Sequence, residues 1–136
     1  MSSAQRLSGG RQEHGRQERG RASERRGRFA ETKAILYLRC KLYRILARRM
    51  RNAAGEIDLI ARSWNGVVCF VEVKARADAA KAAEALGHAQ RGRIARAAAL
   101  YLGAHPKLRH KVVRFDVLYV VPGRLPRHLK NAWQLD

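Results

Sequence analysis

Acidic residues are scarce in this sequence: 29 Lys and Arg face only 11 Asp and Glu, which gives a formal net charge of +18. Such a surplus directs the protein toward polyanions, with nucleic acid as the first expectation and an anionic membrane surface as the second. No apolar run approaches the roughly 20 residues that a membrane-spanning helix needs. The 46% of hydrophobic residues nevertheless predicts a folded domain rather than a disordered chain.

Cysteine is also scarce, because Cys40 and Cys69 are the only two. They form no CxxC pair, which argues against a zinc site, and they do not suggest a disulfide framework. The five histidines have no metal-ligand spacing, and the sequence has no phosphate-binding P-loop, no nucleotide-binding glycine motif and no Ser-His-Asp set. No secretory signal precedes the first apolar cluster, so we expect a cytoplasmic protein.

The first 28 residues lack aromatic side chains and contain eight Arg and three Glu. Such a composition cannot bury enough apolar surface to offset the entropy of ordering, so we expect a mobile basic tail over residues 1–28. Its glutamates argue against an organellar transit peptide. Residues 29–136 are expected to form one domain. The tail contributes +5, which leaves +13 on the domain.

Hydrophobic periodicity predicts two helices and several strands in this domain. Helices are expected from about residue 23 to 42 and over 90–102, and strands over 43–50, 56–62, 67–75 and 111–121, with a short edge strand near 129–133. Gly103 is expected to end the second helix, and residues 77–89 are ambiguous between helix and loop. The order α-β-β-β-α-β predicts an α/β fold with a mixed sheet flanked by helices.

Carboxylates and a lysine occupy two neighbouring predicted strands. Side chains alternate across a strand, so Glu56 and Asp58 share one face of the first strand. Glu72 and Lys74 share one face of the next strand. The apolar residues of both strands are expected on the opposite face.

The loop between these strands decides whether the charged sets meet. A two-residue turn at 65–66 would place the carboxylates on opposite faces. A three-residue loop over 64–66, with Gly66 in the left-handed conformation, pairs Asp58 with Glu72 instead. We prefer the second register because it keeps the apolar residues of both strands together.

Carboxylates this close repel one another and need a counter-charge. A hard divalent cation, Mg²⁺ or Mn²⁺, supplies it. Such a cation polarises a phosphate and activates a bound water, while the ammonium of Lys74 steadies charge. The alternative is an exposed ladder of cross-strand ion pairs, in which Asp58 and Glu72 face Lys74 and Arg76.

The position of Glu31 favours a metal site over a ladder of cross-strand ion pairs. It lies three and four positions before Ala34 and Ile35, on the apolar stripe of the first predicted helix. A carboxylate on a buried face is costly unless it has a partner. Alternatively, Glu31 is a helix-start residue that interacts with the positive end of the helix dipole.

The Asp58…Glu72-x-Lys74 pattern resembles the PD-(D/E)xK nuclease superfamily, whose restriction-endonuclease-like core is a mixed sheet flanked by helices. More narrowly, the chain resembles the uncharacterised YraN family of bacterial proteins, related to archaeal Holliday-junction resolvases. The matching segments span about residues 27–133 and are Ala30-Glu31, Tyr37-Leu38, Gly55–Ala61, Phe70–Arg76, Arg114–Val117 and Asn131–Trp133.

The resemblance implies that Asp58 and Glu72 are metal ligands and that Lys74 is the catalytic lysine. It makes Glu31 a further, helix-borne acidic ligand and Glu56 a supporting carboxylate. Such a resemblance is stronger evidence for a shared fold than for a shared reaction.

The sequence departs from the family pattern at two places. The Lys-Gln pair that usually begins the helix after the ExK strand has its nearest match in Gln90-Arg91, which affects phosphate contacts. Arg49 stands where an Asn is common. Neither departure removes an implied metal ligand.

Two groups of arginines are candidate phosphate contacts, or else solvated basic faces. The first is Arg91, Arg93 and Arg96, and the second is Arg44, Arg48, Arg49 and Arg51; Arg76 is a further candidate. Asp116 is expected to pair with a neighbouring arginine, and all five histidines are expected at the surface.

We therefore expect a Mg²⁺-dependent endonuclease acting on branched DNA. Since a four-way junction has two scissile strands, such an enzyme would be a homodimer. The alternatives are a nucleic-acid-binding module with a weak or silent metal site, and an adaptor whose basic face binds RNA or an acidic protein.

Overall fold

The computed structural model describes residues 27–75 and 87–133. Residues 1–26 of the predicted basic tail, most of the ambiguous stretch 77–89, and Arg76 lie outside the described residues. Within the described chain, no helix is long and apolar enough to cross a membrane.

Five strands form one mixed sheet in the order β1-β2-β3-β4-β5. Their bounds are Arg44–Asn52 (β1), Gly55–Arg62 (β2), Val68–Lys74 (β3), Val113–Tyr119 (β4) and Arg127–Trp133 (β5). Neighbouring strands are antiparallel except β3 and β4, which are parallel. The α-helix α3 (His88–Ala104) and the short 3-10 helix η1 (Pro106–Leu108) connect that parallel pair.

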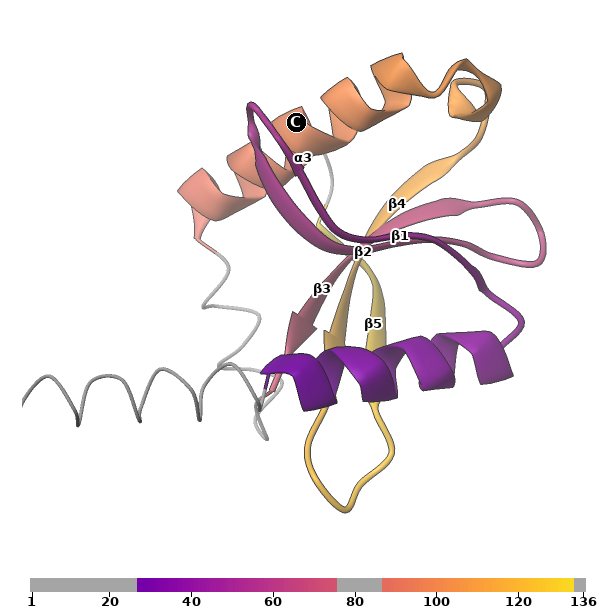
Figure 1. Ribbon diagram of the computed structural model, residues 1–136, viewed down its shortest axis with the longest axis vertical. Coiled ribbons are helices and arrows are strands. Elements are labelled where there is room, and N and C mark those ends of the chain that lie inside the picture. Colours follow the sequence, from indigo (N-terminus) through magenta and orange to yellow (C-terminus); the bar gives the residue numbers. More distant parts are fainter. Residues whose placement is uncertain (1–26, 76–86, 134–136) are drawn as a thin grey trace, which may run out of the picture.

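The sheet lies between two helices (Figure 1). The N-terminal helix, residues 27–40, covers one face, and α3 covers the other. The predicted α/β fold is confirmed, with β5 as the additional edge strand after β4.

Both faces of the sheet are buried, which corrects the expectation that apolar residues would fill only one. Ile60 and Phe70 pack toward α3, whereas Leu59 and Val71 pack toward the N-terminal helix. The crossover helix of a parallel strand pair covers a sheet face, so the central strands become apolar on both sides.

The predicted three-residue loop between β2 and β3 is confirmed. The Ser63 N–H donates to the Val67 carbonyl at 2.9 Å, and Gly66 has a φ of 91°. Ala61 pairs with Cys69 and Leu59 with Val71. Extending this register by one residue sets Asp58 opposite Glu72.

The expectation that Gly103 ends the second helix is wrong, because α3 continues to Ala104. Two backbone carbonyl groups in the last turn of α3 have side-chain hydrogen-bond partners. His105 Nδ1 lies 2.7 Å from the Tyr101 carbonyl oxygen, and Arg109 donates to the Gly103 carbonyl at 2.8 Å. Satisfied carbonyls remove the need for a glycine stop.

Asn52 fixes the β1–β2 hairpin against α3. Its Oδ1 accepts from the backbone N–H groups of Ala54 and Gly55, and its Nδ2 donates to the Ala97 carbonyl at 2.9 Å. Arg49, within β1, has a φ of 46°, in a region that asparagine adopts more readily than arginine.

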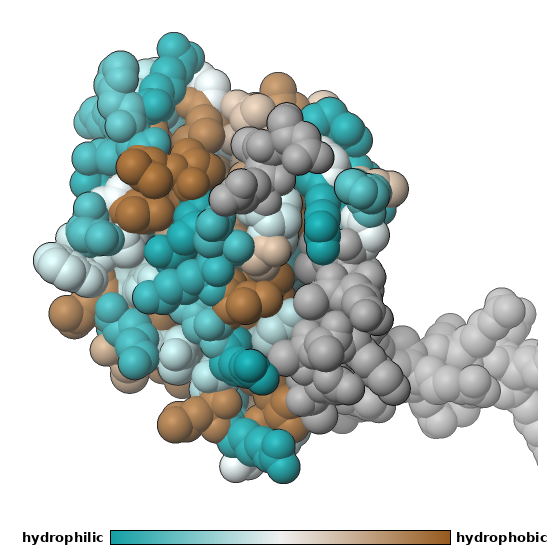
Figure 2. Space-filling model, turned by 180° about the vertical axis from the view of Figure 1, so that it is seen from behind, coloured by the Kyte–Doolittle hydropathy of each residue, from teal (hydrophilic) through white to brown (hydrophobic). Residues whose placement is uncertain are grey.

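Surface hydrophobic residues form separate patches among hydrophilic ones on the side of the molecule seen in Figure 2. The large exposed apolar side chains among the described residues include Phe29, Leu36 and Leu125. Scattered apolar residues of this kind are normal for a folded protein.

Candidate active site

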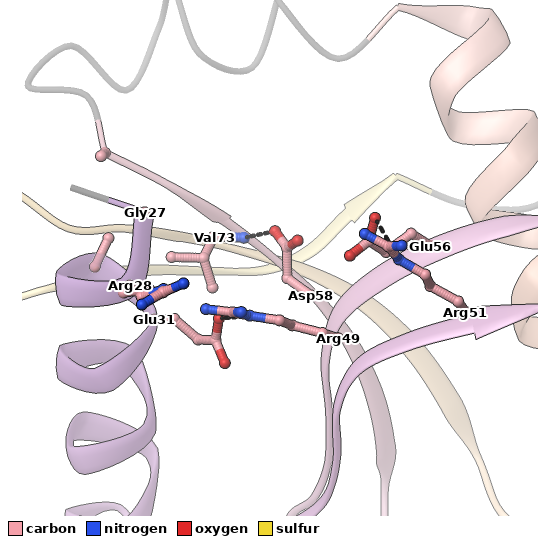
Figure 3. A pocket seen from close by; sticks show the side chains of 10 residues that line it. Gly27, Arg28, Glu31, Arg49, Arg51, Glu56, Asp58 and Val73 are labelled. Atoms are coloured by element: carbon pink, nitrogen blue, oxygen red, sulfur yellow. Dashed lines mark hydrogen bonds and ion pairs between the residues drawn. The ribbon is translucent and has the colours of Figure 1, made fainter. Parts of the chain in front are cut away.

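A cavity of about 350 Å³ opens between the start of the N-terminal helix and the strands β1 to β3 (Figure 3). Three of the predicted acids and two of the predicted arginines line it. The described lining residues are Gly27, Arg28, Ala30, Glu31, Arg49, Arg51, Glu56, Asp58, Val73 and Ala75. The sheet register and the first turn of the helix therefore bring together residues far apart in sequence.

Asp58 lies where the β2–β3 ladder ends. The last backbone pair is Leu59 with Val71, and beyond it the Val73 N–H donates to Asp58 Oδ2 at 2.8 Å. Ile57 packs toward α3 although Leu59 packs toward the N-terminal helix. The strand thus departs from strict alternation around Asp58, which lets this carboxylate line the cavity while it contacts β3.

Glu72 is buried, with only 5% of its surface exposed. Its carboxyl group hydrogen-bonds to that of Asp58, and its Oε1 atom has no hydrogen-bond partner within the described residues. A buried acceptor without a partner is uncommon in a native protein and calls for a specific explanation.

Burial, followed by the negative charge of Asp58, raises the pKa of Glu72 to about 8, against the opposing charge of Lys74. Burial also raises the pKa of Asp58, against hydrogen bonds from Val73 and Glu72 and the charge of Lys74. Two carboxyls this close cannot both ionise easily, which favours a proton held by the pair.

Glu31 has a partner that sequence reasoning did not assign. Its Oε2 lies 2.7 Å from Arg49 Nε, and its side chain is 15% exposed. In Figure 3 the Arg49 side chain reaches from β1 toward Glu31. The predicted need of this carboxylate for a counter-charge is thus met by an arginine.

Glu56 contacts Arg51 at 3.4 Å, and its side chain is 43% exposed. Figure 3 shows this pair set toward the β1–β2 hairpin, apart from Glu31. Among the described residues, no three His, Cys, Asp or Glu side chains converge closely enough to hold a metal ion by themselves.

Two carboxylates such as Asp58 and Glu72 are enough to hold Mg²⁺, because this ion does not need a site made entirely of protein ligands. Mg²⁺ in phosphate-processing sites is held by one or two carboxylates, and water and substrate oxygens complete its shell. Within the part of the chain that the structure describes, Glu72 Oε1 is an unused acceptor, and a bound cation would favour the ionised form of both carboxyls. Glu31 could join this set only by leaving Arg49.

The arginines on α3 adjoin the beginning of β2. A Cβ atom added at Gly55 would lie 3.7 Å from the Arg93 Cβ. Arg93 and Arg96 are exposed, and Arg91 is half-buried. Arg49 and Arg51 line the cavity itself, whereas Arg76 lies outside the described residues.

Sequence reasoning missed a buried polar network around Asp116. As expected, Arg114 pairs with Asp116, through two contacts of 2.8 Å. His128 was expected at the surface, but its side chain is 5% exposed and its Nε2 lies 2.7 Å from Asp116. The Asn131 N–H adds a fourth contact at 3.0 Å. The signal in the sequence was the spacing of Arg114 and Asp116, which places both on one strand face.

Burial by itself would raise the pKa of Asp116, but bonds from His128, Arg114 and Asn131 outweigh it and hold that pKa at about 2. The hydrogen bonds to Asp116, with a smaller contribution from its charge, raise the pKa of Arg114 in turn. This carboxylate is committed to internal partners and does not belong to the cavity beside Asp58.

Comparison with known proteins assigns the chain to a family. The family model described as "Uncharacterised protein family UPF0102" matches residues 30–120. The chain belongs to the UPF0102 family. That stretch contains Glu31, Asp58, Glu72 and Lys74, so the whole carboxylate and lysine set lies within the UPF0102 match. The expected YraN-like family membership is confirmed.

Curated UPF0102 proteins match over most of their length. One from Maricaulis maris is 50% identical over 111 residues, which covers 82% of this chain and 87% of that protein. One from Paramagnetospirillum magneticum is 49% identical over 119 residues, which covers 85% and 92%. One from Parvibaculum lavamentivorans is 50% identical over 113 residues, which covers 83% and 84%.

Proposed function

We propose that this protein is a metal-dependent endonuclease of the PD-(D/E)xK type that hydrolyses phosphodiester bonds in branched DNA. The observation that carries the proposal is the buried Glu72 carboxyl, which hydrogen-bonds to Asp58 on the adjacent strand, where Asp58 lines a cavity with Glu31, Glu56 and several arginines. Lys74 is close enough to lower the pKa of both carboxyls. A structural ion-pair ladder would be solvated, with ionised carboxylates, whereas Glu72 is buried.

Asp58 and Glu72 would hold the cation, Mg²⁺ or Mn²⁺, with Glu31 as a third ligand if Arg49 releases it. The bound ion would supply Lewis acidity toward a phosphate and lower the pKa of a water molecule. The ammonium of Lys74 balances negative charge beside the carboxyl pair. Perturbed carboxyls at a cavity rim are typical of catalytic sites, although structural networks perturb pKa values too.

The arginines around the cavity support a polyanionic substrate. Arg28, Arg49 and Arg51 line it, while Arg93 and Arg96 extend the positive surface along α3. Guanidinium groups bind phosphates without reading sequence, so these residues would position the backbone. Recognition by shape rather than by base sequence is what a branched substrate requires.

A second candidate is a nucleic-acid-binding module with a weak or silent metal site. The Arg49–Glu31 ion pair favours it, because it withholds one implied ligand. The absence of a three-acid cluster among the described residues is consistent with weak metal binding. In this case the arginines would still bind phosphates, and Asp58 could be replaced without affecting affinity.

The deciding experiment is cleavage of a labelled DNA panel containing a four-way junction, a flap, a duplex and a single strand. Each substrate is incubated with Mg²⁺, Mn²⁺ or EDTA, and Asp58→Asn and Lys74→Ala are compared with wild type. Lys107→Ala is the matched control for Lys74→Ala, because Lys107 is an exposed lysine that lines neither cavity. We expect metal-dependent cutting that the first two variants reduce at least about 100-fold.

Binding without cutting, equal in wild type and in both variants, would contradict the nuclease. The binding module would then be the better account. The oligomeric state of the protein on the junction, measured by light scattering, tests the expected homodimer.

A further inference from the structure

A second cavity, of about 340 Å³, lies at the other end of the N-terminal helix. Its lining includes Tyr37 and Lys41, whereas Glu31 lines the first cavity. The ten positions between Glu31 and Lys41 correspond to about 15 Å along a helix axis. Figure 1 shows the end of this helix and the β2–β3 loop on the same side of the molecule.

Positive charge dominates this second cavity. Lys41, Arg114 and Lys130 line it, and no Asp or Glu is among its described lining residues. Lys41 and Lys130 are exposed, and among the described residues neither has a carboxylate partner within ion-pair distance. The cavity therefore has two cations available to an anion.

Arg114 is held in a fixed orientation at the wall. Its Nε and Nη2 bond to Asp116, and Nη2 also donates to the Tyr43 hydroxyl at 2.8 Å. These contacts leave Nη1 without a hydrogen-bond partner among the described residues. A guanidinium fixed in this way presents its remaining donors with little loss of entropy on binding.

An exposed tryptophan stands at the rim. Trp64 is 78% exposed at the tip of the β2–β3 loop and lines the same cavity. The loop is fixed: Ser63 Oγ donates to the Asn65 side chain and accepts from the Val67 N–H. A large indole held in water on a rigid loop is a ready stacking surface for a base.

We propose that this cavity binds a backbone phosphate of single-stranded DNA while the neighbouring base stacks on Trp64. The proposal rests on the proposed function in taking DNA as the ligand. It adds a contact for an unpaired strand at the opposite end of the N-terminal helix from Glu31, about 15 Å away along the helix axis. Cations beside an accessible aromatic ring are the combination that single-stranded nucleic acid requires.

Intrinsic fluorescence reports on this site directly, because the chain has two tryptophans, Trp64 and Trp133, and Trp133 is buried. The full chain carrying Asp58→Asn, to prevent cutting, is titrated with oligo(dT), with a duplex of equal length, with inorganic phosphate and with a phosphopeptide. We expect oligo(dT) to quench the emission, and Trp64→Phe to remove most of the quenching.

Affinity for oligo(dT), measured by fluorescence anisotropy of a labelled strand, provides the second readout. Trp64→Ala should weaken binding about tenfold. The double variant Lys41→Ala/Lys130→Ala should weaken it further and reduce the salt slope by about 0.7, the value for one phosphate contact on a single strand. Lys107→Ala, an exposed lysine outside this cavity, is the matched control and should leave both values unchanged.

The outcomes separate the two proposals. If none of the DNA substrates is cut but oligo(dT) binding depends on Trp64 and the two lysines, the proposed nuclease activity is wrong and the proposed single-strand site is supported. If metal-dependent cutting occurs while these variants bind oligo(dT) as tightly as wild type does, the proposed single-strand site is wrong and the proposed nuclease activity is supported. Equal quenching by the phosphopeptide or by phosphate, with none by oligo(dT), also overturns it.

Discussion

The carboxyl groups of Asp58 and Glu72 hydrogen-bond to each other across β2 and β3, and burial raises the pKa of both. Asp58 reaches the cavity because β2 departs from strict alternation there, and Glu72 is buried against it. The pair has an unused acceptor, Glu72 Oε1, and an adjacent cation, Lys74. Its protonation should therefore respond to pH and to divalent ions together.

Replacing Glu72 with Gln should remove a pH-dependent loss of stability. The pKa of Glu72 is raised to about 8, against about 4.3 for a free glutamate. The folded state thus holds a proton that the unfolded state releases, so this stabilisation is full below about pH 4 and is lost as pH rises through about 8. We expect the Tm of wild type to fall by several degrees relative to Glu72→Gln between pH 5 and 8.

Circular dichroism melts in EDTA measure this difference. Addition of Mg²⁺ at pH 8 should then raise the Tm of wild type but not that of the variant, because ligand binding stabilises only a protein that can bind. Parallel Tm curves for the two proteins across this pH range would contradict proton sharing.

Arg49→Asn should improve binding of Mn²⁺. The change removes the ion pair that holds Glu31 and leaves the backbone at its φ of 46°, which Asn adopts readily. A freed carboxylate adds ligand charge to the site, so we expect affinity to rise about three- to tenfold in calorimetric titrations. The double variant Arg49→Asn/Glu31→Gln is the control, and a gain that persists in it would exclude Glu31 as a ligand.

Asp116→Asn should destabilise the fold by about 3–5 kcal/mol, because it removes the buried charge that pairs with the half-buried Arg114. Urea unfolding measures the change. Glu56→Gln, at an exposed carboxylate, should change stability by less than about 1 kcal/mol. A similarly small effect of Asp116→Asn would show that Arg114 finds another partner.

Leu42→Gly should stabilise the protein. Leu42 has a φ of 66° and is 72% exposed, at a helix end where the Tyr43 N–H bonds to the Leu38 carbonyl. Glycine is the favoured residue in this left-handed capping position. We expect a gain of about 0.5–1 kcal/mol in thermal unfolding. The same change at Leu36, inside the helix, should cost about 1 kcal/mol, and equal losses at both sites would contradict the capping account.

The sequence predicted the correct β2–β3 register, with a three-residue loop ending in a left-handed Gly66. The reason given for preferring that register was wrong, because apolar residues fill both faces of the sheet. It predicted the helices and strands to within a few residues because periodicity is local. It could not predict that β2 departs from alternation at Asp58, since that depends on how the sheet packs between two helices. It also gave no sign that Arg49 would pair with Glu31 or that His128 would be buried, because these contacts join distant segments.

The three-residue loop between β2 and β3 also bears on how the protein folds. Asp58 and Glu72 are 14 positions apart on strands that this short loop joins, so closing the hairpin costs little chain entropy. The β3–β4 pairing, by contrast, joins Val68 to Val113 and must wait for α3. Hairpins form in about 1–10 μs. The carboxyls would therefore meet while still in water and ionised, and the pKa of Glu72 would rise only when the rest of the domain buries it.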